Sequence, residues 1–172
     1  MGSLIDQINA NDAYYILKKL YESDESIARK IEEVANLYLS QVDREQIANN
    51  LFLDLDFLEV EELWDSSGST RYGYIDTGDR AYEMVEEVIE PYLDEMKKYY
   101  NLGYYQDSSE ICIGILQGLI QFDKESKTQF REWAEDIADA MFEQVWDEYK
   151  ELVNKETDIS DMEEIVAGLR EI

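Results

Sequence analysis

Carboxylates are the most abundant reactive groups in this chain, and two clusters of them have the spacing of a helix face. The clusters consist of Glu86, Glu87, Glu90 and Asp94, and of Glu132, Glu135, Asp136 and Asp139. Carboxylate oxygens are the ligands that Mg²⁺ and Ca²⁺ prefer, so each cluster offers a weak site for a hard cation. Acids beside an apolar stripe ordinarily form its solvated side, however. We therefore predict no specific metal site.

Other catalytic chemistry is limited by the absence of histidine and by a single cysteine, Cys112. Without imidazole there is no serine or cysteine triad, no zinc hydrolase site of the usual kind and no Glu-x-x-His di-iron site. Cys112 lies in the apolar run 110–117, which predicts a buried and unreactive thiol.

A pair of carboxylates can cleave a glycosidic bond if burial raises the pKa of one of them. Only Asp54 and Asp56 lie in apolar sequence, and both fit the end of a helix. We expect no catalytic residue, no cofactor and no enzymatic activity. A carboxylate-dependent hydrolase or metal-binding protein stays open as the alternative.

The best candidate for recognition is the segment 66–78, the only stretch that is dense in glycine and serine. Its arginine is surrounded by aromatic residues, and such a guanidinium group can stack on a ring and donate paired hydrogen bonds to a carboxylate. This chemistry suits the binding of a peptide or an anion. The candidate binding residues are Trp64, Asp65, Arg71, Tyr72 and Tyr74.

A structural interpretation of the same residues is also open. In that interpretation Arg71 pairs with an acid such as Asp65 or Asp76 and holds the loop in place, while Trp64 and the tyrosines cover the core.

Helical periodicity runs along almost the whole chain, so we expect helices to position these residues. Apolar residues recur every three or four positions in segments at about 13–20, 27–38, 47–55, 60–64, 79–101, 105–122, 130–152 and 162–169. We predict an all-α fold of seven or eight antiparallel helices, arranged as a helical-repeat-like (solenoid or TPR-like) bundle with little or no strand. The predicted N-caps are Asn11, Ser23 or Asp24, Asp43, Ser126 and Ser160.

The segment 105–122 is apolar on most sides and should be the buried centre of the fold. Its residues Gly114 and Gly118 share one face, where the backbone of another helix can approach closely. Pro91 should kink or restart the preceding helix, and Gly103 should end that helix in a left-handed cap. We predict a single domain, residues 1–172, with a possible subdomain break at the loop 66–78.

Forty-one acidic and fifteen basic residues give the chain a formal net charge of −26. Such a charge repels DNA phosphates and anionic lipid, so we expect no nucleic-acid partner and no membrane partner. It favours solubility, and it also suits an acidic face for a basic protein partner or mimicry of nucleic acid. The N-terminus does not resemble a signal peptide, and the run 111–122 is too short to span a bilayer. We expect a cytoplasmic protein.

Two stretches carry a resemblance to known proteins. LWDSSGSTRYGYIDTGDRAYEMVEEVIEPYLDEMKKYYNLG and ICIGILQGLIQF are similar to a family of uncharacterised prokaryotic all-helical proteins. They also resemble, more distantly, the helical region that accompanies SWIM-type zinc fingers in bacterial proteins. The resemblance covers roughly residues 43–146 and implies an all-α, helical-repeat-like scaffold with no activity to carry over. The zinc finger itself needs cysteines and a histidine and is missing here.

Shape and contact are therefore the expected basis of function. We expect a non-enzymatic scaffold or adaptor that binds another protein through a groove between helices or through the loop 66–78. The hydrolase or metal-binding protein is one alternative. A structural protein that associates with itself through an exposed apolar helix face is another, in which case the chain would form a homo-oligomer.

Overall fold

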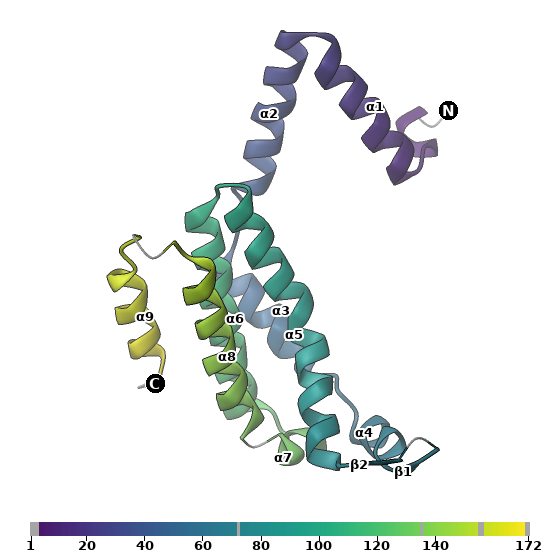
Figure 1. Ribbon diagram of the computed structural model, residues 1–172, viewed down its shortest axis with the longest axis vertical. Helices are drawn as coiled ribbons and strands as arrows, with labels where there is room; N and C mark the ends of the chain where they lie inside the picture. Colours follow the sequence, from purple (N-terminus) through teal and green to yellow (C-terminus); the bar gives the residue numbers. More distant parts are fainter. Residues whose placement is uncertain (1–3, 72, 135, 155–156, 171–172) are drawn as a thin grey trace. The chain divides into compact units, whose positions relative to one another are not determined.

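The computed structural model describes residues 4–71, 73–134, 136–154 and 157–170 (Figure 1). Within these residues the chain forms nine α-helices, one 3-10 helix and one pair of short strands, so the all-α prediction is confirmed. The helical-repeat-like arrangement stays a prediction. The chain divides into two compact units, Met1–Gln41 and Val42–Ile172. The loop 66–78 lies inside the second unit, and the single-domain prediction stays open.

The first unit is a helical hairpin. It contains a 3-10 helix, Leu4–Gln7, followed by α1 (Ala10–Ser23) and α2 (Glu25–Leu39). The Asp24 side chain caps α2 by accepting hydrogen bonds from the backbone N–H groups of Ser26 and Ile27, as predicted. The prediction of Asn11 as the cap of α1 is wrong, because Asn9 accepts the capping bond from the Asp12 N–H at 2.9 Å.

The hairpin buries no residue of either helix. Ten large apolar side chains of α1 and α2 are between 38% and 76% exposed. We call this set the hairpin apolar surface; it comprises Tyr14, Tyr15, Ile16, Leu17, Leu20, Tyr21, Ile27, Val34, Leu37 and Tyr38. The two helices are joined across the hairpin by a 2.6 Å hydrogen bond from the Tyr21 hydroxyl to Glu32.

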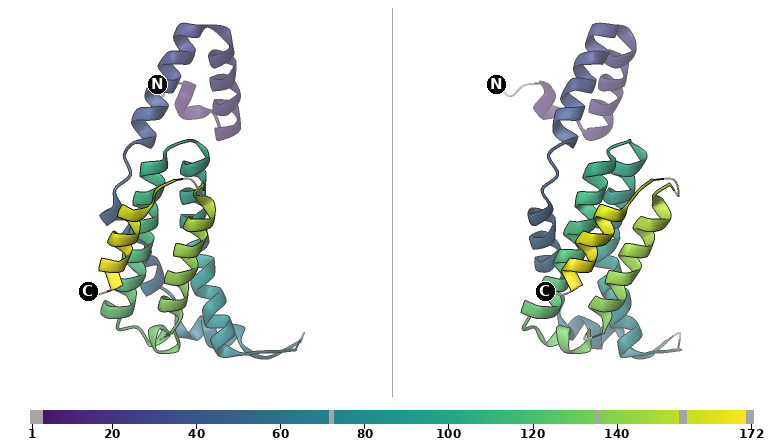
Figure 2. Two further views of the ribbon diagram at one scale, coloured as in Figure 1. Left: turned by 60° about the vertical axis from the view of Figure 1, so that its left-hand side comes forward. Right: turned by 90° about the vertical axis from the view of Figure 1, so that its left-hand side faces the viewer.

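The second unit is a helical bundle with a small β-hairpin at one end (Figures 1 and 2). Its elements in chain order are α3 (Arg44–Asp56), α4 (Val60–Ser66), β1 (Gly68–Thr70), β2 (Gly73–Ile75), α5 (Thr77–Asn101), α6 (Tyr105–Glu125), α7 (Gln129–Trp133), α8 (Ile137–Leu152) and α9 (Ser160–Arg170). The antiparallel strands pair Gly68 with Ile75 and Thr70 with Gly73. The predicted loop thus contains a short β-hairpin. Its first strand begins at Gly68, whose φ of 82° lies in the left-handed region.

Helix α6 is the centre of the second unit, as predicted. It packs against α3, α5, α8 and α9, and Figure 1 shows it running between α3, α5 and α8. Most of its residues between 108 and 122 are buried, and the thiol of Cys112 is fully enclosed. Burial raises the pKa of this thiol well above its usual range, so the prediction of an unreactive cysteine agrees with its surroundings.

The closest helix contact of the unit is made by two glycines of α6. A Cβ atom at Gly114 would lie 2.9 Å from the carbonyl oxygen of Arg44, and one at Gly118 would lie 2.8 Å from that of Ala48. Both oxygens belong to the backbone of α3, so the predicted close approach of a second helix is confirmed. Asp43 caps α3, also as predicted, and starts this helix beside the glycines.

A tight turn joins the two longest helices. Gly103 has a φ of 88°, and the N–H groups of Gly103 and Tyr104 donate to the carbonyl oxygens of Tyr100 and Tyr99. These bonds form the Schellman motif that ends α5, so the predicted left-handed cap is confirmed. Helix α5 continues through Pro91 and does not restart there.

The predicted helix 130–152 is divided into α7 and α8, which accounts for the ninth helix. The prediction of Ser126 as the cap of this segment is wrong, because the N-cap of α7 is Thr128, whose hydroxyl accepts a hydrogen bond from the Arg131 N–H. The Arg131 side chain turns back to α6, where its Nε donates to the Asp123 carbonyl at 3.1 Å and its guanidinium pairs with the Asp123 carboxylate. This contact links α7 to the end of α6, and α8 begins at Ile137.

Replacing Gly118 with alanine should destabilise the protein. The new methyl group would meet the α3 backbone, and overpacking of this kind costs about 1–3 kcal/mol, more than the roughly 1 kcal/mol that alanine adds to helix propensity. Urea unfolding of Gly118→Ala should therefore give a lower free energy of unfolding.

Gly168→Ala is the matched control, because a Cβ at Gly168 in α9 would have no neighbour within 4 Å. This substitution should raise the free energy of unfolding by up to about 1 kcal/mol. Equal effects of the two substitutions would contradict a close α3–α6 contact.

A second prediction concerns the alkaline limit of stability. Burial raises the pKa of Tyr149 from 10.0 to about 12, and its ring stacks on Trp146 at 5.8 Å between centroids. The unfolded phenol ionises first, so the stability present below pH 10 should fall by about 2 kcal/mol as the pH rises to about 12. Tyr149→Phe should remove this part of the pH dependence in urea titrations. Parallel losses in both proteins would rule out Tyr149 as a source.

Candidate functional site

Four of the five binding residues that the sequence indicates lie around the β-hairpin, with their side chains turned to solvent. Trp64 and Asp65 are exposed near the end of α4, Arg71 is exposed in the turn between the strands, and Tyr74 in β2 is 72% exposed. Tyr72 lies outside the described residues. No ion pair joins Arg71 to an acid within the part of the chain that the structure describes. The role of these residues as a binding site therefore stays a prediction.

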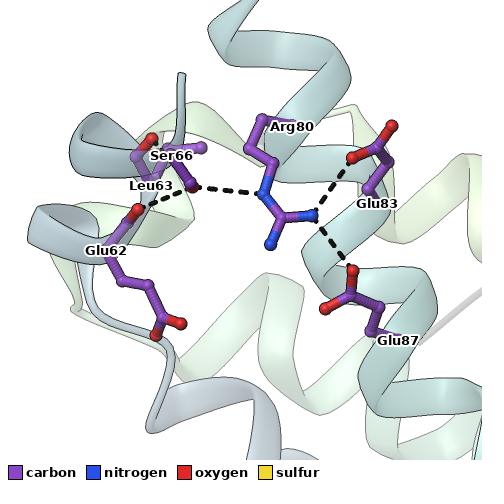
Figure 3. A network of polar contacts seen from close by, with 6 residues as sticks. All are labelled: Glu62, Leu63, Ser66, Arg80, Glu83 and Glu87. Atoms are coloured by element: carbon purple, nitrogen blue, oxygen red, sulfur yellow. Dashed lines mark hydrogen bonds and ion pairs between the residues drawn. The ribbon is translucent and has the colours of Figure 1, made fainter. Parts of the chain in front are cut away.

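Arg80, rather than Arg71, ties this region to the bundle (Figure 3). Its Nε donates to the Ser66 hydroxyl at 3.1 Å, and its NH1 contacts the carboxylates of Glu83 and Glu87 at 3.1 and 3.0 Å. The Ser66 hydroxyl in turn donates to the Glu62 carbonyl at 2.7 Å. The hydrogen bond to Glu87 is the main cause of a raised Arg80 pKa.

Asp76, considered from the sequence as a partner of Arg71, has a different role. Its carboxylate accepts a hydrogen bond from the Gly78 N–H at 2.8 Å and so caps α5. The Thr77 hydroxyl also contacts that of Ser67 at 3.3 Å. Together with Arg80, these bonds fix the start of α5 beside the end of α4.

The first carboxylate cluster of the sequence lies along a groove between α5 and α8. Glu86, Glu87, Glu90 and Asp94 fall within an arc of about 100° on α5, and we call them the α5 acidic stripe. They line a groove of about 380 Å³ whose floor is formed by four buried apolar residues. These floor residues are Ile89, Leu93, Met141 and Val145.

Polar contacts across the groove hold its two walls together. The Tyr82 hydroxyl donates to Gln144 at 2.7 Å, and the amide nitrogen of Gln144 lies 3.4 Å from Glu86. Lys97 pairs with Glu148 at 2.6 Å. Lys97 is thus already engaged by an acid of the opposite wall.

The charge of the stripe is only partly compensated. Glu87 pairs with Arg80, but neither Glu90 nor Asp94 has a cation within ion-pair distance among the described residues. Both of these side chains are exposed. The stripe can therefore attract a positively charged group without first breaking an existing pair.

On its other side, α5 forms a second groove with α3, of about 620 Å³. Phe57 lies at its edge and is 78% exposed, and the Tyr92 hydroxyl donates to Asp54 at 2.5 Å. Burial, followed by this hydrogen bond, raises the pKa of Tyr92 well above its usual range. Asp56 accepts a hydrogen bond from the Ser126 hydroxyl at 2.7 Å. The two acids in apolar sequence thus join elements of the bundle.

A third groove, of about 470 Å³, lies between α6, α8 and α9. Its charges are mixed, since Arg170 pairs with Glu143 at 2.5 Å and also lies 4.8 Å from the ring centroid of Phe142. Asp139, from the second carboxylate cluster, lines this groove, whereas Glu135 lies outside the described residues. The described residues contain no group of three or more acids or cysteines arranged to hold a metal ion.

Comparison with known proteins identifies no relative of this chain. No protein-family model, curated protein or solved structure matches the chain. The resemblance to prokaryotic all-helical proteins therefore stays a prediction. None of the helices that the structure describes combines the length and apolar character needed to cross a bilayer.

Replacing Arg80 with alanine should loosen the β-hairpin and destabilise the bundle. The Arg80 side chain is 18% exposed and donates to a hydroxyl and two carboxylates, and a hydrogen bond to a charged group contributes about 1.5–3 kcal/mol. Urea unfolding should show a loss within this range. Chymotrypsin should also cleave Arg80→Ala faster after Tyr74.

Arg71→Ala is the matched control for this prediction. Because Arg71 is exposed and has no ion pair among the described residues, its loss should leave both the unfolding free energy and the cleavage rate nearly unchanged. If Arg71→Ala were the more damaging of the two, Arg80 would not be the anchor.

Proposed function

We propose that this protein is a non-enzymatic helical scaffold that binds a basic segment of another protein along the α5 acidic stripe. The observation that carries the proposal is the convergence of four carboxylates on one groove, three of them (Glu86, Glu90 and Asp94) without a cation partner among the described residues. Glu148 on the opposite wall is already paired with Lys97, so the attraction comes from the α5 side of the groove. Opposite charge across an interface speeds association and selects the partner by its sign.

Apolar surface near the stripe supports the same function. The neighbouring α3–α5 groove shares Glu87 with the stripe and contributes the exposed ring of Phe57 and the surface of Pro91. An aromatic contact beside a charged patch is the usual composition of a protein interface, in which a few large side chains contribute most of the affinity. An amphipathic basic helix would satisfy both parts of this surface.

The net charge supports the remaining parts of the proposal. A chain with a formal charge of −26 repels polyanions, so we propose that the partner is a protein and neither a nucleic acid nor a membrane. We further propose a cytoplasmic location in a prokaryotic cell and a helical-repeat-like use of the bundle. A hydrolase or metal-binding function has no supporting observation among the described residues.

A basic model peptide tests the proposal. The probe is a synthetic helical peptide of alternating leucine and lysine segments with a fluorescent label, and its binding is measured by anisotropy at low and at physiological salt. Glu90→Lys/Asp94→Lys should weaken binding roughly tenfold or more, because it reverses two of the three uncompensated charges of the stripe.

The control variant is Glu151→Lys/Glu164→Lys, which makes the same change in net charge at exposed positions of α8 and α9. It should change the affinity by less than about twofold, because a distant surface charge is screened by salt. A peptide with glutamine in place of lysine should not bind. Equal weakening by both variants would mean that only net charge attracts the peptide, and the proposed stripe would be rejected.

A further inference from the structure

The hairpin of the first unit is too small to account for its own stability. Helices α1 and α2 have 14 and 15 residues, and neither buries a single side chain. Isolated helices of about this length are marginal in water, and most helical stability in proteins comes from packing of an apolar face. The hairpin apolar surface therefore has to be covered by something outside the hairpin.

The pattern of apolar residues on α1 and α2 indicates what kind of element can pack on the hairpin apolar surface. On α2, Ile27, Ile31, Val34 and Tyr38 fall within an arc of about 60°, the repeat expected for a helix that packs along another helix. Helix α1 carries a wider arc, formed by Ile16, Leu17, Leu20 and Tyr21 together with Ala13 and Tyr14. A pair of such helices completes a core when it meets a second pair, as in a four-helix bundle.

We propose that the cover is the hairpin of a second copy of this chain, so that the protein is a homodimer joined by a four-helix bundle of two α1–α2 hairpins. The inference is independent of the proposed binding of a basic segment. A dimer would, however, carry two copies of the α5 acidic stripe.

The exposed apolar area of the hairpin is large enough for a stable contact with a second hairpin. Aromatic side chains bury about 150–250 Å² each, so the four tyrosines of the set, which are 44–76% exposed, provide roughly 500 Å² per hairpin. The six aliphatic side chains raise this area to the order of 800 Å². A stable interface buries about 800 Å² on each partner. In a two-fold symmetric contact both sides present the same surface, so two hairpins match each other in area and in apolar character.

Charge also favours a second hairpin over a strongly charged partner. Residues 1–41 contain seven acidic and four basic residues, a net charge of −3, whereas the remaining residues carry −23 of the total of −26. The sides of the hairpin are lined with ion pairs of alternating sign, Lys19–Glu22, Glu25–Arg29 and Lys30–Glu33. Two copies therefore repel each other less when they meet through their hairpins than when they meet through their second units.

Sedimentation velocity and light scattering on the full chain test the dimer over a hundred-fold range of concentration. The wild-type protein should be a dimer. Leu17→Glu and Val34→Glu should each raise the dissociation constant at least roughly 100-fold, because the two-fold axis places two charges in an apolar interface. Both substitutions remove the cover of the hairpin, so the helix content by circular dichroism should fall by at most the 14 and 15 residues of α1 and α2.

Leu53→Glu is the control, because Leu53 on α3 is 49% exposed and Leu17 is 48% exposed. This variant should remain a dimer. Hydrogen exchange of the wild-type protein provides a measurement that does not depend on variants: protection of the α1 and α2 amides should rise with concentration, while that of α6 should not.

Two results would overturn the homodimer. One is a wild-type chain that is monomeric at every concentration, whether its hairpin is then covered by its own second unit or by a different protein. The other is a dimer that Leu17→Glu and Val34→Glu leave unchanged. Neither result bears on peptide binding to the α5 acidic stripe, so the two proposals fail separately.

Discussion

The direct contact of the α3 backbone with two glycines of α6 is the constraint on which the second unit depends. A side chain at Gly114 or Gly118 would overlap a carbonyl oxygen of α3, so these positions set the distance between the two helices. At this separation Leu51 and Leu55 of α3 are fully buried. The opposite sides of α6 are then free to pack against α5 and α8, and the groove that carries the α5 acidic stripe lies between those two helices. Close-packed cores transmit such a spacing because they have little free volume.

The chain separates its two kinds of surface. The second unit keeps a complete apolar core and presents acids to solvent, whereas the hairpin keeps a modest net charge and presents apolar side chains. The exposed charge is thus concentrated on the second unit, and the exposed apolar surface of the helices on the hairpin. The two contacts that we propose, between hairpins and with a basic segment, therefore use residues of different units.

Features that depend on local sequence could be predicted, and features that depend on distant side chains could not. The central helix, the glycine contact and the caps at Asp24, Asp43 and Gly103 follow from periodicity or from one residue's own backbone preference. The break between α7 and α8 was not predicted, because no glycine or proline marks it between residues 130 and 152.

The candidate site could likewise be predicted only in part. The acids of the stripe were recognisable from their spacing, but the wall opposite them comes from α8, and Gln144 is more than 50 residues from Glu86 in sequence. The sequence analysis did not single out Arg80, whose partner Ser66 precedes the β-hairpin. The signal that could have found Arg80 is its i+3 spacing to Glu83, which occurs too often on helices to be specific.

The Schellman turn at Gly103 also bears on how the molecule reaches its structure. It connects the two longest helices through a few residues, so the entropy lost on closing this loop is small. The glycine contact, by comparison, joins segments about 70 residues apart. Loop closure of that length is slower, and local contacts form sooner. We therefore expect α5 and α6 to form the folding nucleus, onto which α3 docks in a later step.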